Sequence, residues 1–173
     1  NVDICQAQLI IENGSTFNIN EESVDQEGGK DAPGYRLDSS VNAGARVLNL
    51  DSESSFHAGD ELLIINLKKG PRSPTSDAVG KYETAGVVSV AGRRVTIDKD
   101  LLNDYPAGSD YVWVQRIPTY KSLTIEAGGT LTATGWDGEG HGVLALRIQG
   151  ELNVEGGGVV LVERLRVTPP RFE

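Results

Sequence analysis

The feature that most constrains the fold is a stretch of short β-prone runs joined by glycine corners, at residues 122–158. Runs at 123–125, 143–148 and 152–154 alternate apolar and polar residues, and Gly-Gly or Gly-polar pairs separate them. This alternation between glycine turns is typical of short strands at tight corners. Aligning the triplet that begins at Leu123 with the one that begins at Leu146 predicts a repeat of a length suited to stacked coils.

The N-terminal segment has the same pattern as this stretch. The sequence LIIENGSTFNI, from residue 9, aligns with LTIEAGGTLTA, from residue 123. The matches pair Leu9 with Leu123, Ile11 with Ile125, Glu12 with Glu126, Gly14 with Gly128 and Phe17 with Leu131. The alternative is chance, because any short strand followed by a glycine turn shares part of this pattern. A true repeat predicts that both chain ends belong to one sheet system and that the residues between them are inserted.

Composition limits the class of partner. The chain has 173 residues, which suits one domain with a small insertion, and its 21 glycines suit many turns around thin sheets. A net charge of −9 does not favour a nucleic acid or an anionic membrane, because the basic groups at 68–72 and 93–94 are too short to reverse the field. No apolar run approaches the ~20 residues of a membrane span. The lack of methionine indicates a chain that begins after processing, after tag removal or within a longer protein, and a cleaved secretory signal is one simple explanation.

Residues 21–40 are charged and aperiodic, with Gly-Gly and Pro-Gly pairs, and they predict a long surface loop. Its carboxylates could collect calcium, and they are Glu21, Glu22, Asp25, Glu27 and Asp31. They do not follow the Asp-x-Asp-x-Asp-Gly spacing that wraps one calcium ion. We therefore predict a solvated acidic loop and no cofactor, with calcium as the alternative.

Residues 41–118 predict a separate small β module. Candidate strands joined by polar turns lie at 46–50, 61–67, 81–90, 95–97 and 111–117, with a hairpin turn at 91–93. Five or six short strands over about this length indicate a small antiparallel barrel or sandwich. No helix of normal length fits anywhere in the sequence.

The predicted fold is all-β, with β-solenoid-like or β-sandwich-like strands from both chain ends and a small antiparallel β-barrel inserted between them. Three parts are predicted. They are residues 1–40, the N-terminal strands and acidic loop; residues 41–118, the barrel or sandwich module; and residues 119–173, the glycine-rich solenoid-like segment and terminal strand.

The order of motifs in and after this module resembles that of a known class of proteins. FHAGDELLI begins at Phe56, YETAGVVSVAGRRVTI at Tyr82 and YPAGS at Tyr105, and LTIEAGGTLT, WDG and GVLA follow. This order is similar to a small β module of large secreted bacterial surface proteins, adhesin-like or fibre-like, in which it precedes or interrupts a β-helical segment. The resemblance covers roughly residues 56–157 and rests on structural turns. It implies an architecture and a secreted or cell-surface location, bacterial or archaeal, rather than an activity.

The C-terminal run VVLVERLRV, at 159–167, is apolar and strongly β-prone. Because an exposed apolar strand edge promotes association, this run either completes its own sheet or pairs with a neighbouring subunit, which would build a head-to-tail polymer. The single cysteine is either a buried apolar residue or half of an interchain disulfide. The predicted assembly residues are Cys5, Leu9, Ile11, Val160, Val162, Leu165 and Val167.

Motifs for catalysis are missing from the sequence. His57 and His141 lie in glycine-containing turns without zinc-site spacing, and no Gly-x-Ser-x-Gly, phosphate-loop or dinucleotide motif occurs. Trp136 and Asp137, with Tyr120, form a candidate carbohydrate site, because an aromatic face beside polar groups suits a sugar ring. The alternative is that Trp136 closes the end of a coil and Asp137 begins its turn.

A candidate acidic set for glycan cleavage consists of Asp137, Glu139 and Glu151. About three coils leave little room for a substrate groove, so cleavage is not favoured.

Together these patterns predict a structural or adhesive extracellular protein without enzyme activity. It would act by self-association, as a homo-oligomer or filament, or by binding a cell-surface glycan, with no nucleic acid and no membrane insertion. A carbohydrate-binding module is the first alternative, and a fragment of a β-helical polysaccharide-cleaving enzyme is the second.

Overall fold

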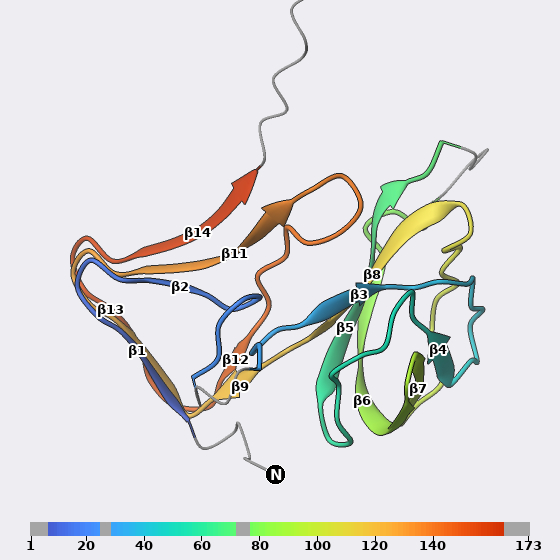
Figure 1. The fold of residues 1–173 in the computed structure, drawn as a ribbon, viewed down its shortest axis with the longest axis horizontal. Coiled ribbons are helices and arrows are strands. Elements are labelled where there is room, and N and C mark those ends of the chain that lie inside the picture. The colour runs from blue at the N-terminus through green and yellow to red at the C-terminus, as the bar shows by residue number, and fades with distance from the viewer. Residues whose placement is uncertain (1–6, 25–28, 72–76, 165–173) are drawn as a thin grey trace, which may run out of the picture.

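A computed structural model describes residues 7–24, 29–71 and 77–164 of the chain. Within these ranges the fold is all-β, with strands β1 to β14 and no helix (Figure 1). Parallel strands from both chain ends stack as coils, and an antiparallel sheet is inserted between the first coil and the second. The predicted fold class is confirmed.

The coils are built from short parallel strands in three small sheets. The strand orders are β1-β10-β13, β2-β11-β14 and β9-β12. The bounds are β1 Gln8–Ile11, β2 Thr16–Asn18, β9 Thr119–Tyr120, β10 Ser122–Ile125, β11 Thr130–Trp136, β12 Arg147–Ile148, β13 Leu152–Val154 and β14 Val159–Arg164.

The predicted repeat between the two chain ends is confirmed by the register of these sheets. Leu9 of β1 pairs with Leu123 of β10, and Phe17 of β2 pairs with Leu131 of β11. Every second side chain of a strand points to the same face, so the apolar positions of the triplets face the coil interior. Leu9 and Leu123 are accordingly buried in one core cluster.

The predicted repeat between Leu123 and Leu146 is wrong in register. Leu123 pairs with Leu152, whereas the triplet that begins at Leu146 contains β12, which pairs with β9. The similar triplets therefore lie on different sides of the coil. Apolar-polar alternation reports that a residue faces inward, but it does not report which side of the coil carries it.

Glycine is required at the corner between the two longer sides of each coil. Gly14, Gly128 and Gly157 occupy this corner with φ values of +75°, +83° and +94°, a conformation that residues with a side chain rarely adopt. At the next position, a Cβ on Gly129 would lie 2.8 Å from the carbonyl oxygen of Ile11. The Gly-Gly corner thus allows neighbouring coils to stack closely.

The inserted sheet has six antiparallel strands in the order β3-β8-β5-β6-β7-β4. The bounds are β3 Gly34–Arg36, β4 Val47–Asn49, β5 Glu61–Lys69, β6 Tyr82–Ala91, β7 Arg94–Ile97 and β8 Asp110–Arg116. An isolated bridge between Leu37 and Leu50 joins the segments that follow the two edge strands, β3 and β4. The sheet therefore curls around a core of its own, which includes Leu48, Ile64 and Val114. We call this curled sheet the barrel.

One strand of this sheet lies in the segment that the sequence predicts as a loop. β3 has the sequence GYR, which shows no apolar alternation, and it is a strand because it pairs with β8. The hairpin turn predicted at 91–93 is confirmed between β6 and β7.

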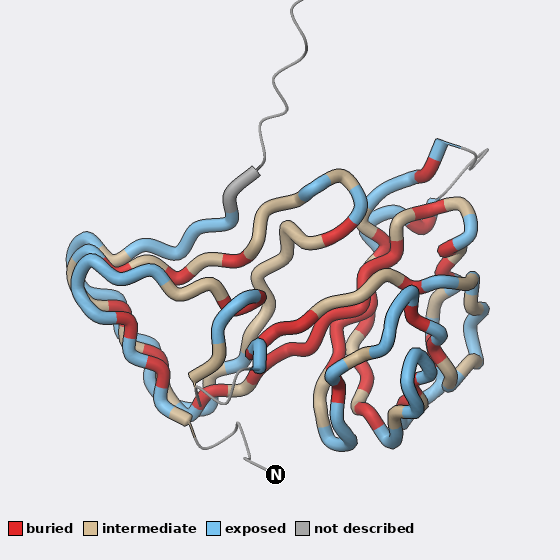
Figure 2. Tube along the Cα trace, in the orientation of Figure 1, coloured by how far each residue is buried: buried red, intermediate tan, exposed pale blue. Residues whose placement is uncertain are grey.

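The inserted sheet leaves and rejoins the coil at adjacent points. The backbone N–H of Arg116 donates to the carbonyl oxygen of Pro33 at 3.0 Å. Ala32, just before this crossing, belongs to the coil core, whereas Leu37 belongs to the core of the inserted sheet. Figure 2 shows the two groups of buried segments, one in each part of the molecule.

Candidate functional site

The third coil leaves its inward-facing positions open to solvent. Val160 is 53% exposed, whereas Leu131, its partner in the second coil, is 1% exposed. Leu152 is 58% exposed beside Leu123 at 1%, and Figure 2 shows β14 as an exposed segment. Within the described ranges, no strand pairs with the outer edge of β13 or β14. The third coil thus combines apolar side chains with open backbone edges.

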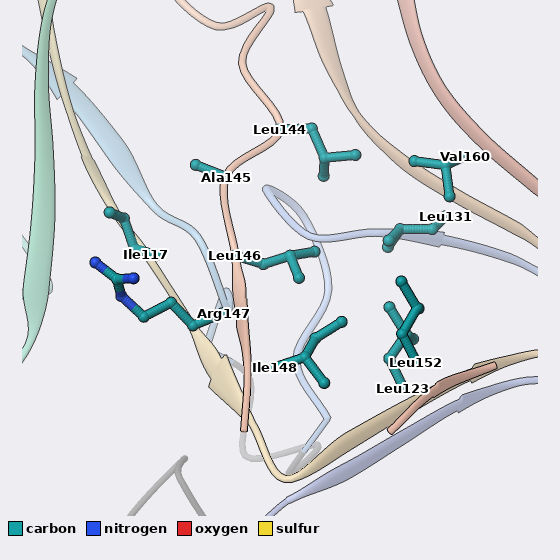
Figure 3. A pocket seen from close by; sticks show the side chains of 10 residues that line it. All are labelled: Ile117, Leu123, Leu131, Leu144, Ala145, Leu146, Arg147, Ile148, Leu152 and Val160. Atoms are coloured by element: carbon teal, nitrogen blue, oxygen red, sulfur yellow. The ribbon is translucent and has the colours of Figure 1, made fainter. Parts of the chain in front are cut away.

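A cavity of about 360 Å³ lies in the coil interior next to this coil. Figure 3 shows Leu144, Leu146 and Ile148 on one side of it, with Leu131 and Leu152 on the other. The lining is mostly apolar, so the cavity is suited to further apolar side chains rather than to a polar ligand.

Arg147 is the charged residue of the cavity lining, and it joins the coil to the barrel. Its guanidinium forms hydrogen bonds and an ion pair with the carboxylate of Glu61 on β5. This contact holds the pKa of Glu61 below its ordinary value. The charge of Arg147 is thereby neutralised outside the apolar interior.

The predicted assembly residues fall into three groups. Val160 and Val162 lie on the exposed β14, at 53% and 39% exposure. Leu9 and Ile11 are buried in the first coil, so β1 can contribute to an interface through its backbone but not through these side chains. Their burial follows from the inward alternation of β1. The remaining residues, Cys5, Leu165 and Val167, lie outside the described residues.

Trp113 of β8 fixes the barrel to the loop between β11 and β12. It is 4% exposed, and its indole N–H donates to Gln115 Oε1 at 3.1 Å. The ring lies against Gly34 and Gly140, where an added Cβ would come within 2.4 Å of it. The ring of His141 packs on it with centroids 4.6 Å apart. This close fit leaves no space for larger residues at the two glycines.

Tyr120 lies inside the molecule rather than on a sugar-binding surface. It is fully buried, and its hydroxyl donates to Asp31 Oδ2 at 2.7 Å. The guanidinium of Arg116 donates to the backbone carbonyls of Asp31, at 2.6 Å, and Lys30. The proposed contact of Tyr120 with a carbohydrate is therefore wrong, because a buried ring offers no face to a ligand. Asp31 also departs from the predicted solvated loop, since it is 2% exposed.

Burial of Asp31 predicts a pH dependence of stability. Desolvation raises the pKa of its carboxyl above the ordinary 3.8, although the hydrogen bond from Tyr120 and the charge of Arg116 act in the opposite direction. Because the folded-state pKa is the higher one, this group stabilises the fold most below pH 3.8, and the contribution is lost as the pH rises through the folded pKa. Asp31→Asn has no titratable carboxyl at this position, so its stability should not fall with rising pH on account of this residue.

The measurement is the free energy of unfolding in urea at several pH values from 3.5 to 7. The difference between the wild type and Asp31→Asn should change in favour of the variant as the pH rises. Asp51→Asn, at an exposed carboxylate, controls for the loss of one negative charge. A difference that stays constant with pH would contradict the raised pKa.

Trp136 and Asp137 lie at the end of β11. Asp137 Oδ1 accepts hydrogen bonds from the backbone N–H groups of Glu139, at 2.9 Å, and Gly140, at 2.8 Å. Partial burial disfavours the ionised carboxyl, but these two donors hold the pKa of Asp137 below its ordinary value. Asp137 thus begins a turn. This is the alternative to a sugar-binding role for Asp137 in the sequence analysis. Trp136 is partly exposed and contacts Tyr111 edge to face, with centroids 6.5 Å apart.

Three residues that the sequence does not single out lie in a group beside this tryptophan: Tyr111 and Lys68 contact its ring, and Arg36 contacts Tyr111. Lys68 Nζ lies 5.3 Å from the ring centroid of Tyr111 and 5.9 Å from that of Trp136. Arg36 Cζ lies 5.0 Å from the Tyr111 centroid. A β-bulge between Asn66 and Lys68 places Lys68 opposite Tyr111. The pattern of a single strand does not show a bulge, so the sequence carried no signal for this group.

No group of three or more His, Cys, Asp or Glu side chains that could hold a metal ion occurs among the described residues. The same part of the chain has no helix with the length and apolar character needed to cross a membrane.

No protein-family model matches the chain, and the search of curated proteins found no match. Similar solved structures include the tailspike gp61 of Pseudomonas phage phi297, with a TM-score of 0.43 and 18% identity over 83% of this chain. The tailspike gp49 of Pseudomonas phage LKA1 has a TM-score of 0.40 and 16% identity over 89%. The Gp54 tailspike of Acinetobacter baumannii bacteriophage AP22, solved in complex with A. baumannii capsular saccharide, has a TM-score of 0.41 and 18% identity over 91%.

The chain spans 26%, 32% and 27% of the length of these three tailspike chains. The strand pairing described above defines the fold.

Proposed function

We propose that the chain is a structural module of an extracellular surface protein and that it associates head to tail through its coils. The third coil carries this proposal, because its inward-facing Leu152 and Val160 are more than half exposed while their partners in the second coil are buried. An added coil would remove these side chains from water and pair the open backbone edges. The extracellular location rests on the resemblance of residues 56–157 to secreted surface modules.

The two ends of the coil stack are compatible in strand direction. β1 and β13 are the opposite edges of one parallel sheet, and β2 and β14 are the opposite edges of another. The first coil of a second copy can therefore continue both sheets, with β1 beside β13 and β2 beside β14. Each partner uses a different surface in this contact, so the assembly is an open filament rather than a closed dimer.

Apolar side chains at both ends of the coil stack also support this contact. The first coil borders a hollow of about 620 Å³, whose lining includes the partly buried Phe17 and Val24 beside the carboxylates of Glu21 and Glu22. The third coil presents Leu152 and Val160 as exposed apolar side chains that line the cavity at its own end. In the filament, these apolar side chains of the two ends would be buried against each other, as those of the second coil are already buried between its neighbours.

Val160→Asp should abolish this association. A carboxylate buried at every junction lacks a partner, which should weaken the association constant by roughly a hundredfold or more. The measurement is sedimentation of the purified chain over a range of concentrations, with negative-stain microscopy of the same samples. The wild type should form elongated oligomers that grow with concentration, and Val160→Asp should remain monomeric.

Val88→Asp is the matched control, because Val88 on β6 is as exposed as Val160, at 53%. It should assemble like the wild type. A wild-type chain that stays monomeric at millimolar concentration would contradict the proposal, and so would equal effects of the two substitutions.

A further inference from the structure

We propose that the seam between the barrel and the coil binds a carboxylate-bearing saccharide, such as a uronic-acid oligomer, through Lys68, Arg36, Tyr111 and Trp136. A ligand class is thereby given to the carbohydrate alternative, and Lys68, Arg36 and Tyr111 are added to Trp136, which the sequence singles out. This site does not depend on the assembly proposed above, because none of the four residues belongs to β1, β2, β13 or β14.

Two cations meet at this seam in a chain of net charge −9. Lys68 is exposed, and none of the ion pairs among the described residues includes it. Arg36 is 33% exposed at its side chain and pairs with Glu139 Oε2 at 2.9 Å. Because the overall field repels anions, an anionic ligand is attracted only where cations are concentrated locally. The Lys68 ammonium and the open side of the Arg36 guanidinium provide such a place.

Two aromatic rings form an angled wall against which these cations lie, with Lys68 over both rings and Arg36 over that of Tyr111. The rings of Tyr111 and Trp136 stand at 84° to each other, and both residues are partly exposed. Aromatic rings pack against the apolar C–H groups of a sugar, while nearby charged groups bind its polar substituents. Cations next to rings therefore favour a ligand that combines an apolar ring face with a carboxylate.

A cavity of about 280 Å³ adjoins Arg36 and Tyr111 and is also bordered by Gly108 and Ser109. This volume is close to the lower limit of about 300 Å³ for small-ligand pockets, so it suits one sugar unit. Asp110 also lines the cavity, but its carboxylate already accepts hydrogen bonds from Asn66 and from the backbone N–H of Gly70. The oxygens of Asp110 are therefore already engaged within the protein.

Regular strands, rather than loops, position these cations. Lys68 pairs with Tyr111 between β5 and β8, after the bulge that re-aims the strand end. Arg36 pairs with Trp113 between β3 and β8, two residues from Tyr111. Paired residues of antiparallel strands lie on the same face of the sheet. The sheet thus holds Lys68, Tyr111 and Arg36 together before any ligand binds.

The test is calorimetric titration of the full chain at low salt with trigalacturonate and with its methyl ester, which lacks the negative charges. Trigalacturonate should bind about tenfold or more tightly than the ester, and Lys68→Met should remove most of that advantage. Glu139→Gln should strengthen trigalacturonate binding, because it releases Arg36 from its ion pair. Lys81→Met, at an exposed lysine on another part of the barrel, should bind like the wild type.

The opposite responses of Lys68→Met and Glu139→Gln separate ligand binding from a purely structural role of the seam. Equal affinity for the acid and the ester, no effect of Lys68→Met, or no binding at millimolar ligand would each overturn the proposal. The monomeric Val160→Asp variant should bind as the wild type does, so failure of the assembly and failure of this site are distinguishable.

Discussion

Replacing Trp113 by alanine should lower the free energy of unfolding by about 3–5 kcal/mol, the usual cost of truncating a buried tryptophan. Trp113 is 4% exposed and fills the space between the barrel and the coil loop. Its removal leaves a cavity bordered by Gly34 and Gly140, whose lack of side chains prevents them from filling it. It also leaves Gln115 Oε1 without the indole donor. The measurement is urea-induced unfolding followed by circular dichroism.

Two controls test whether the close fit around Trp113 is the cause. Trp136→Ala removes the same side chain from a partly exposed position and should cost about 1 kcal/mol. Gly140→Ala should also destabilise, because its Cβ would lie 2.4 Å from the indole, whereas Gly156→Ala has no atom within 4 Å of the new Cβ. Equal effects of the two glycine substitutions would contradict the packing described for Trp113.

Arg116→Met should cost a similar amount, about 3–5 kcal/mol, because it breaks a buried charged network by removing one partner. Arg116 is 8% exposed. It donates to the carbonyls of Lys30 and Asp31, and its guanidinium lies 3.9 Å from Asp60 Oδ2. Without it, two carbonyls lose their charged donor and the Asp60 carboxylate loses the ion pair with Arg116.

The conservative variant and an exposed arginine provide the comparison for Arg116. Arg116→Lys keeps the charge but loses the planar fork of donors, so it should recover only part of the stability. Arg93→Met breaks an exposed ion pair with Asp38 and should change the stability little. An Arg116→Met chain as stable as Arg93→Met would show that the network adds nothing to the fold. Both free energies come from the same urea titrations.

Local alternation was enough to predict the coils, because it repeats at each chain end. Leu9 and Leu123 could be matched since each begins a triplet whose first and third residues are aliphatic and which is followed by an acidic residue and a glycine corner. The structure pairs these two residues. Alternation failed between Leu123 and Leu146, because the two triplets have the same pattern but lie on different sides of the coil.

Contacts between distant segments account for the other differences. Tyr120 donates a hydrogen bond to Asp31, which lies far from it in the sequence and whose backbone carbonyl accepts a hydrogen bond from Arg116. Lys68 reaches Tyr111 only because of a bulge in β5. The sequence shows no periodic pattern for either arrangement, so neither could be predicted before the structure was known.

The hydrogen bond between the Arg116 N–H and the Pro33 carbonyl has an evolutionary consequence. The inserted barrel begins and ends at neighbouring points, a geometry in which domain insertion is well tolerated. A lineage can therefore lengthen, diversify or exchange the barrel without changing the path of the chain through the coils. The residues that restrict such exchange are those at the seam, above all Trp113 and the glycine at position 140 against which it packs.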